Sequence, residues 1–127
     1  DLHSFPTRRS SDLEILPDIY NSAFAFLYTS LRESFGIPLL EAMACGTPVI
    51  TSNTSSMPEI GGPNAILINP ENPEEIAEMM LKLENEDIFY RKQEQVGLER
   101  AKLFSWKHTA EQLLEVYDHV YKRTSKR

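Results

Sequence analysis

Two glutamates flank a glycine-containing turn in the stretch ESFGIPLLE, residues 33–41. Gly36 lets the backbone approach a ligand closely, and Pro38 suits the first position of a helix, so that the amide groups nearby point outward. Because a helix N-terminus attracts anions through its free amides and its dipole, the turn predicts a seat for a phosphate group. A diphosphate held there would need no metal ion, since the amides and the dipole supply the positive field.

The two carboxylates lie on either side of this seat. Glu41 is expected in the first turn of the helix, where it could accept hydrogen bonds from the vicinal 2′ and 3′ hydroxyls of a ribose. Glu33 is expected in the preceding loop, where it could accept hydroxyls of whatever group lies beyond the phosphates. The order of carboxylate, amides and carboxylate matches sugar, diphosphate and ribose. As a structural alternative, Glu41 could complement the helix dipole and Glu33 could be a solvated loop charge.

Strand-like and helix-like pieces alternate from Glu14 onward, which is typical of a parallel sheet with crossover helices. The strand expected over 24–30 is apolar almost throughout and is predicted to be covered on both faces. The pattern predicts an α/β fold: the distal half of a Rossmann-like, doubly wound parallel sheet domain, followed by a C-terminal helical tail. We expect strands over 24–30, 49–53 and 65–69, and helices over 16–23, 38–45, near Pro58, over 72–83, over 87–103 and after Ser105.

Local signals mark the ends of several helices. Gly46 is expected to cap the helix over 38–45, and Asn72 with Glu75 three residues later forms an asparagine version of the capping box. Ser105 is expected to cap the last helix. Apolar residues recur at helical spacing along that helix and predict a packing stripe, made of Trp106, Ala110, Leu113, Leu114, Tyr117 and Val120 or Tyr121.

The motif Glu-x7-Glu with Phe-Gly-Ile-Pro inside it resembles that of retaining, nucleotide-sugar-dependent glycosyltransferases. These enzymes have the B-type fold of two Rossmann-like domains and are loosely called glycosyl transferases group 1. The same family is matched by four neighbouring segments, LEAMACGTPVITS, MPEIGG, DIYNSAFAFLYTS and FSWKHTAEQLLEVY. The resemblance covers roughly residues 14–121.

This resemblance implies a role for each part of the motif. Glu33 would contact the donor sugar and help to steady the reacting centre, and Glu41 would hold the ribose. Thr29 stands where a proline is more usual, which is expected only to loosen the loop. The donor is a nucleotide-diphosphate sugar, with no cofactor and no metal expected. Sugar hydroxyls and the distal phosphate would be held by backbone amides around Ser34, Phe35, Gly36 and Ile37.

Several parts that the family uses are not found in this sequence. The missing parts are a basic Arg/Lys pair on the diphosphate, a base-reading loop and a whole N-terminal acceptor domain; Arg32 takes neither position of the pair. The chain is therefore expected to be an incomplete and inactive fragment of a hexosyltransferase. Two alternatives stay open: a non-catalytic nucleotide-binding or interaction module on the same half-fold, and a nucleotide-sugar epimerase.

Composition limits the other classes of function. With 127 residues, of which 41% are apolar, the chain can bury one modest core. The net charge of -6 and the lack of a dense run of Lys or Arg argue against nucleic acid as a partner. The longest apolar stretch, 22–28, is too short to cross a bilayer, so membrane contact is expected only through the missing part. The single cysteine, Cys45, fits a reducing, cytoplasmic setting.

Residues 1–13, DLHSFPTRRSSDL, show no helical or strand period and are expected to be a tail outside the fold. The part HSFPTRRSSDL resembles the translation of a sequencing-adaptor oligonucleotide, which would make the tail an artefact. An ordinary disordered terminus is the alternative. If the tail is an artefact, the true neighbour of Glu14 is missing and the chain is the end of a longer protein. The remainder, 14–127, is expected to be a partial donor-binding C-terminal Rossmann-like domain.

Overall fold

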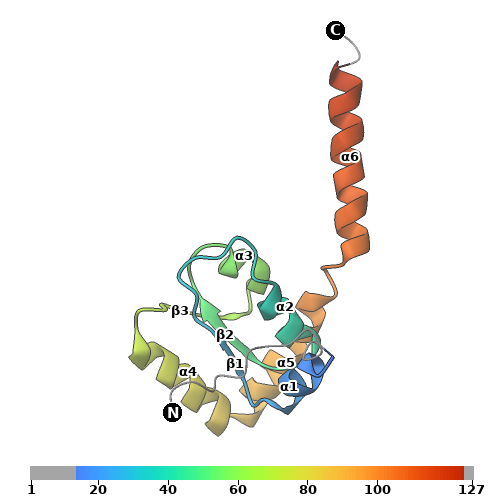
Figure 1. Cartoon of the computed structure of the whole chain (residues 1–127). Helices are drawn as coiled ribbons and strands as arrows, with labels where there is room; N and C mark the ends of the chain where they lie inside the picture. The colour runs from blue at the N-terminus through green and yellow to red at the C-terminus, as the bar shows by residue number, and fades with distance from the viewer. Residues whose placement is uncertain (1–13, 125–127) are drawn as a thin grey trace, which may run out of the picture.

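The computed structural model describes residues 14–124, and the prediction for residues 1–13 lies outside this range. Within it, three parallel strands form an open sheet of order β1-β2-β3, and helices lie around the sheet (Figure 1). The predicted α/β arrangement with a C-terminal helical tail is confirmed. The elements in chain order are α1 (Leu16–Ser22), β1 (Phe26–Tyr28), α2 (Ile37–Ala44), β2 (Val49–Ser52), α3 (Met57–Gly61), β3 (Ile66–Ile68), α4 (Pro73–Asn85), α5 (Asp87–Ala101) and α6 (Trp106–Thr124).

Each face of the sheet carries its own apolar cluster. On one face Val49 packs with Leu39 and Met43 of α2 and with buried residues of α3. On the other face Ile50 and its neighbours on β3 pack under α4, where Leu83 is 1% exposed. Because β2 alternates between these two clusters, all four of its residues are buried, as expected for the central strand of a parallel sheet.

Strand β1 is less covered than its sequence predicts. Leu27 pairs with Ile50, which pairs in turn with Ile66, so the three side chains share one face of the sheet. Helix α4 contacts β3 on this face, at the far edge of the sheet from β1. Leu27 is therefore 40% exposed, and the prediction that this strand is covered on both faces is wrong within the described residues.

Helix α2 begins one residue earlier than its proline suggests. Gly36 adopts a left-handed conformation with φ of 97° and takes the cap position, so Ile37 is the first helical residue and Pro38 the second. Glu41 is then the fifth residue and lies in the second turn, and no acidic residue occupies the first turn. The prediction that Glu41 falls in the first turn is wrong. Because the helix dipole acts mainly on the first turn, the alternative that Glu41 only complements the dipole is less favoured.

Of the two hydrogen bonds predicted for the capping box of α4, only one is present. The side chain of Asn72 accepts a hydrogen bond from the Glu75 amide at 3.2 Å, as the capping-box pattern predicts. The Glu75 carboxylate, however, accepts from the amide of Asn69 at 2.9 Å, because the Asn72 amide already donates to the Asn69 carbonyl. The capping box thus reaches into the loop that follows β3. At α6 the predicted cap is present, with Ser105 Oγ accepting from the His108 amide at 3.1 Å.

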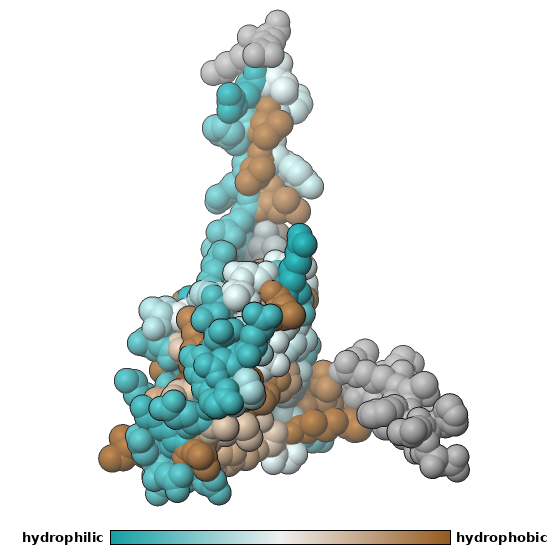
Figure 2. Space-filling view, turned by 90° about the vertical axis from the view of Figure 1, so that its left-hand side faces the viewer, coloured by the Kyte–Doolittle hydropathy of each residue, from teal (hydrophilic) through white to brown (hydrophobic). Residues whose placement is uncertain are grey.

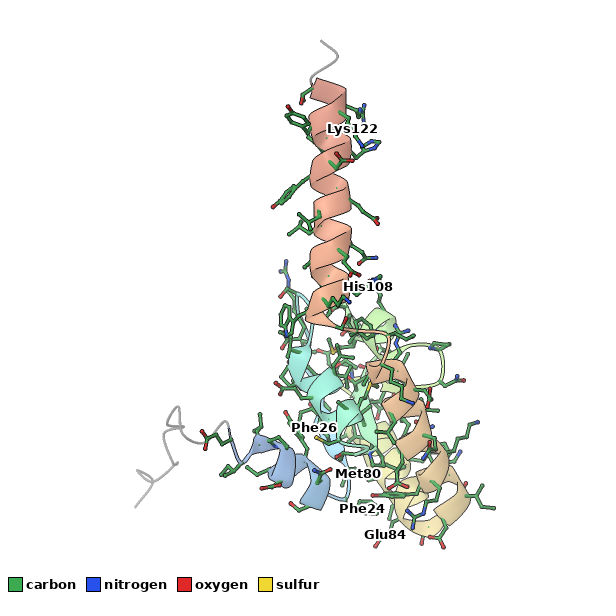
Figure 3. All side chains as sticks on the ribbon, turned by 90° about the vertical axis from the view of Figure 1, so that its right-hand side faces the viewer. Phe24, Phe26, Met80, Glu84, His108 and Lys122 are labelled. Atoms are coloured by element: carbon green, nitrogen blue, oxygen red, sulfur yellow. The ribbon has the colours of Figure 1, made fainter. Side chains whose placement is uncertain are left out.

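Helix α6 leaves the body of the molecule and projects away from it (Figure 1). Its apolar side chains form a visible stripe along the helix (Figure 2), and no other described element lies beside it between His108 and Lys122 (Figure 3). Trp106 is 80% exposed, and α6 has no buried residue. The helix is correctly predicted. The prediction that its apolar stripe packs against the domain is wrong for residues 14–124, because the link after α5 leads the helix away from the sheet. No helix in this range is both long enough and apolar enough to span a membrane.

Candidate functional site

The turn that joins β1 to α2 is shaped by a glycine. Gly36 lies at φ of 97°, a conformation that other residues adopt only at a cost in free energy. A Cβ atom added at Gly36 would press on Cε of Met57, the end of a flexible side chain that is fully buried in α3. The backbone conformation therefore favours glycine at this position, and any other residue would also have to displace Met57.

Several backbone amides in this turn have no acceptor within the described part of the protein. The first amide of α2 that bonds within the protein is that of Leu39, which donates to the Gly36 carbonyl at 3.0 Å. The hydrogen bonds among residues 14–124 include none from the four preceding amides, which belong to Ser34, Phe35, Gly36 and Ile37. Such a run of donors beside a helix N-terminus can hold an anionic group.

Glu33 is held by a tyrosine from the end of β1. The Tyr28 hydroxyl donates to Oε1 of Glu33 at 2.7 Å. Burial raises the pKa of Tyr28 to about 12, with further contributions from the hydrogen bond to Glu33 and from its charge. The phenol therefore stays a protonated donor across the physiological range. Phe26 stacks on Tyr28 with 5.7 Å between ring centroids, which restricts movement of the tyrosine ring.

Glu41 has a tyrosine partner as well. The Tyr20 hydroxyl donates to Oε2 of Glu41 at 3.1 Å. Among the described residues, neither Glu33 nor Glu41 forms an ion pair, and only one oxygen of each carboxylate receives a hydrogen bond from the protein. The other oxygen of each carboxylate has no donor within residues 14–124 and can accept hydroxyl groups.

A cavity of about 500 Å³ lies between α2 and the start of α6. Phe35, Ile37 and Glu41 line it together with Phe104 and Trp106, whereas Glu33 is not among its lining residues. The structure therefore brings Phe35, Ile37 and Glu41 of the predicted set to one cavity, and Glu33 does not line it. Within residues 14–124, no three His, Cys, Asp or Glu side chains gather closely enough to hold a metal ion.

Cys45 lies near the end of the same helix as Glu41. Burial raises the pKa of the Cys45 thiol, and the charge of Glu41 raises it further. A thiol that resists ionisation is a poor nucleophile, so Cys45 serves as a small packing residue.

Sequence reasoning missed a run of hydroxyl side chains that braces the loop before Gly36. We call it the hydroxyl run, and its members are Thr51, Ser52, Thr54, Ser55 and Ser56. Thr51 donates to the Tyr28 carbonyl at 2.9 Å, and Ser52 donates to that of Ser30 at 2.5 Å. Thr54 follows with a bond of 3.3 Å to the Leu31 carbonyl. Three hydroxyls of one segment thus bond three carbonyls of the other, in the same order along the chain.

The last two members of the run reach the predicted site itself. Ser55 Oγ donates to the Glu33 carbonyl at 2.7 Å and accepts from the Glu33 amide at 3.1 Å. Ser56 Oγ lies 3.2 Å from the Glu33 carbonyl oxygen and 3.0 Å from that of Phe35. The available signal was compositional: five of the six residues 51–56 carry hydroxyls, directly at the carboxyl end of a buried strand.

Comparison with known proteins places this geometry in a family. The profile described as "Glycosyl transferases group 1" matches residues 5–100. The O-antigen chain mannosyltransferase B of Escherichia coli is 38% identical over 104 residues, which are 82% of this chain and 27% of that protein. The MMP alpha-(1->4)-mannosyltransferase of Mycolicibacterium hassiacum is 33% identical over 116 residues, 88% of this chain and 28% of that protein.

A solved structure has the same arrangement of elements. Sucrose-phosphate synthase from Thermosynechococcus elongatus superposes with a TM-score of 0.74 at 29% identity, over 83% of this chain and 27% of that one. The chain thus spans about a quarter of the length of these relatives. Since the family profile covers most of the sequence, including both glutamates and the turn between them, the chain belongs to the glycosyl transferases group 1 family.

Proposed function

We propose that this segment binds the nucleotide-diphosphate-sugar donor of a retaining glycosyltransferase that moves a hexosyl unit to a glycan, lipid or small-molecule acceptor. The observation that carries the proposal is the pair of carboxylates on either side of the Gly36 turn. Tyr28 orients Glu33 and Tyr20 orients Glu41, and each leaves one carboxylate oxygen that no donor among residues 14–124 reaches. Between them lie four consecutive amides that have no protein acceptor within the described residues.

In this proposal the parts of the site act on different parts of the donor. The amides of 34–37 bind the distal phosphate, and the dipole of α2 stabilises the negative charge that develops on the leaving diphosphate. Glu33 accepts hydroxyls of the sugar and steadies the positive charge that develops near its anomeric carbon. Glu41 accepts the ribose hydroxyls. The acceptor hydroxyl attacks from the face that the diphosphate leaves, so the anomeric configuration is retained.

Parts outside this segment must complete the site. The matched segment covers only 27% of each of these two relatives, and we propose that the remainder supplies an acceptor-binding domain and a basic pair for the diphosphate. The 127-residue chain alone would then be inactive. Two of the relatives are mannosyltransferases, which favours mannose as the transferred hexose. We place the protein in the cytoplasm, where the lone Cys45 fits a reducing compartment.

The test uses the full-length protein that contains this segment. Purified protein is incubated with nucleotide-activated hexoses and a panel of glycan, lipid and small-molecule acceptors, and the product is analysed by NMR. We expect a new glycosidic bond with the anomeric configuration of the donor. Glu33→Ala should lower kcat with little change in the donor KM, because charge develops at the sugar only in the transition state. A product of inverted configuration, or full activity of Glu33→Ala, would contradict the proposal.

A further inference from the structure

We propose that Tyr28 and Ser55 are positioning residues that together hold Glu33 in its working orientation. Tyr28 fixes the carboxylate, and Ser55 fixes the main chain from which that side chain extends. The inference rests on the proposed role of Glu33 at the donor sugar. It adds Tyr28, at the end of β1, and Ser55, in the loop after β2, to a site that the sequence predicted from residues 33–41 alone.

The Tyr28 contact suits a positioning role because its geometry leaves the carboxylate little freedom. Tyr28 is the last residue of β1, so its backbone is held by pairing with Thr51 of β2. Its ring stacks on Phe26, and its hydroxyl reaches Oε1 of Glu33 at 2.7 Å. A short bond from a fixed phenol selects one rotamer of Glu33 and leaves Oε2 for a sugar hydroxyl.

The Ser55 contact fixes the other end of the same residue. Its single hydroxyl donates to the Glu33 carbonyl at 2.7 Å and accepts from the Glu33 amide at 3.1 Å, so both polar groups of the Glu33 backbone are bound by one side chain. Ser55 does this from φ of 57°, and it is the one residue other than glycine with positive φ among residues 14–124. Because this conformation costs free energy, its presence indicates that the bonds from Ser55 to the Glu33 backbone stabilise this part of the site.

These two contacts meet on a loop with no secondary structure of its own. Between Tyr28 and Gly36 the chain forms no helix or strand, so its shape depends on bonds from outside. The bonds come from the neighbouring strand and the loop after it, and the register of β1 against β2 sets their spacing. Positioning of Glu33 is therefore a property of the paired strands and not of the Glu-x7-Glu stretch.

Steady-state kinetics of the full-length protein test the inference. We expect Tyr28→Phe to lower kcat roughly 10- to 100-fold, the loss expected for a hydrogen bond to a charged group, with the donor KM nearly unchanged. Ser55→Ala should lower kcat about 3- to 10-fold, as for neutral hydrogen bonds. Ser55→Gly relaxes the positive φ but also lacks the hydroxyl, so it should lose as much as Ser55→Ala. Recovery of wild-type kcat in Ser55→Gly would overturn the role of the hydroxyl.

A matched control is available at the other end of β1. The Tyr90 hydroxyl donates to the Phe24 carbonyl at 3.0 Å, its ring stacks on Phe24, and burial raises the pKa of Tyr90 too. Tyr90→Phe deletes a comparable phenol far from Glu33 along the strand, and it should keep wild-type kcat. An equal loss in Tyr90→Phe and Tyr28→Phe would mean that only the packing of the domain was affected, and would overturn the inference.

Two further measurements separate failure of this inference from failure of the proposed function. In a Glu33→Ala background, Tyr28→Phe should cause no further loss of kcat, because its target is gone. Hydrogen exchange of the peptide over 31–37 should be faster in Ser55→Ala than in wild type or Tyr90→Phe, since the Glu33 amide loses its acceptor. Full activity of Glu33→Ala would contradict the proposed function. This inference alone would be contradicted if Glu33→Ala loses much of its activity while Tyr28→Phe shows no kinetic loss and Ser55→Ala shows no faster exchange.

Discussion

Glu41→Ala in the full-length protein should weaken binding of the nucleotide-sugar donor while leaving the chemical step nearly unchanged. The ribose is remote from the reacting carbon, so its hydroxyls bind equally in the ground state and in the transition state. Removal of such uniform binding raises KM without lowering kcat. This behaviour is opposite to that expected of Glu33→Ala, so the two glutamates can be told apart by kinetics.

The size of the effect follows from the contacts of Glu41. The Tyr20 hydroxyl occupies Oε2 at 3.1 Å, and Oε1 has no protein donor within the described residues. Charge-assisted hydrogen bonds to the ribose are worth about 1.5 to 3 kcal/mol, which corresponds to a donor KM raised roughly 10- to 150-fold. The protein should stay folded, because Glu41 is only half-buried and lies beyond the first turn of α2. We expect its free energy of unfolding to change by about 1 kcal/mol or less.

The assay compares two donors on two proteins. A donor with a 2′,3′-dideoxyribose should bind wild type more weakly than the natural donor, yet should bind Glu41→Ala almost as well as the natural donor does. Glu78→Ala removes an exposed carboxylate from α4 and serves as the matched control, with kinetics like those of wild type. Equal losses of the dideoxy donor on wild type and Glu41→Ala would refute the assignment, because Glu41 would then have no contact with the ribose.

Three further predictions concern the segment itself. The 127-residue chain alone should transfer no sugar and bind a nucleotide sugar more weakly than millimolar, since few groups must offset the entropy of association; calorimetry that finds micromolar binding would contradict this. Gly36→Ala forces a Cβ toward Met57 at positive φ, so urea denaturation should show a loss of about 1 to 3 kcal/mol, whereas an unchanged midpoint would show that the turn adapts freely. The pKa of Tyr28 is raised from 10.0 to about 12, so the unfolded chain loses this proton first as the pH rises. Stability from Tyr28 is thus complete below pH 10.0 and lost by about pH 12, and Tm should fall less steeply over this range in Tyr28→Phe.

Much of the fold can be predicted from the sequence because its signals are local. Short apolar runs bounded by turn residues predicted the three strands found within residues 14–124, since a buried parallel strand is apolar on both faces. Asn72 and Ser105 marked the starts of their helices through side-chain bonds that span only three residues. Gly36 and Pro38 likewise indicated a turn that leads into a helix, and the structure has one there. The ligand roles of Glu33 and Glu41 stay predictions.

What only the tertiary structure decided involves residues far apart in the chain. Tyr20 lies 21 residues from Glu41, and Ser55 lies 22 residues from Glu33, so both contacts depend on the register of β1 against β2 and on how α1 packs against α2. No local period encodes that register. The exposure of Leu27 follows from the position of α4 over the far edge of the sheet. An apolar stripe on α6 predicts a helix with one apolar face, but whether that face meets a partner is decided by where the preceding link sends the helix.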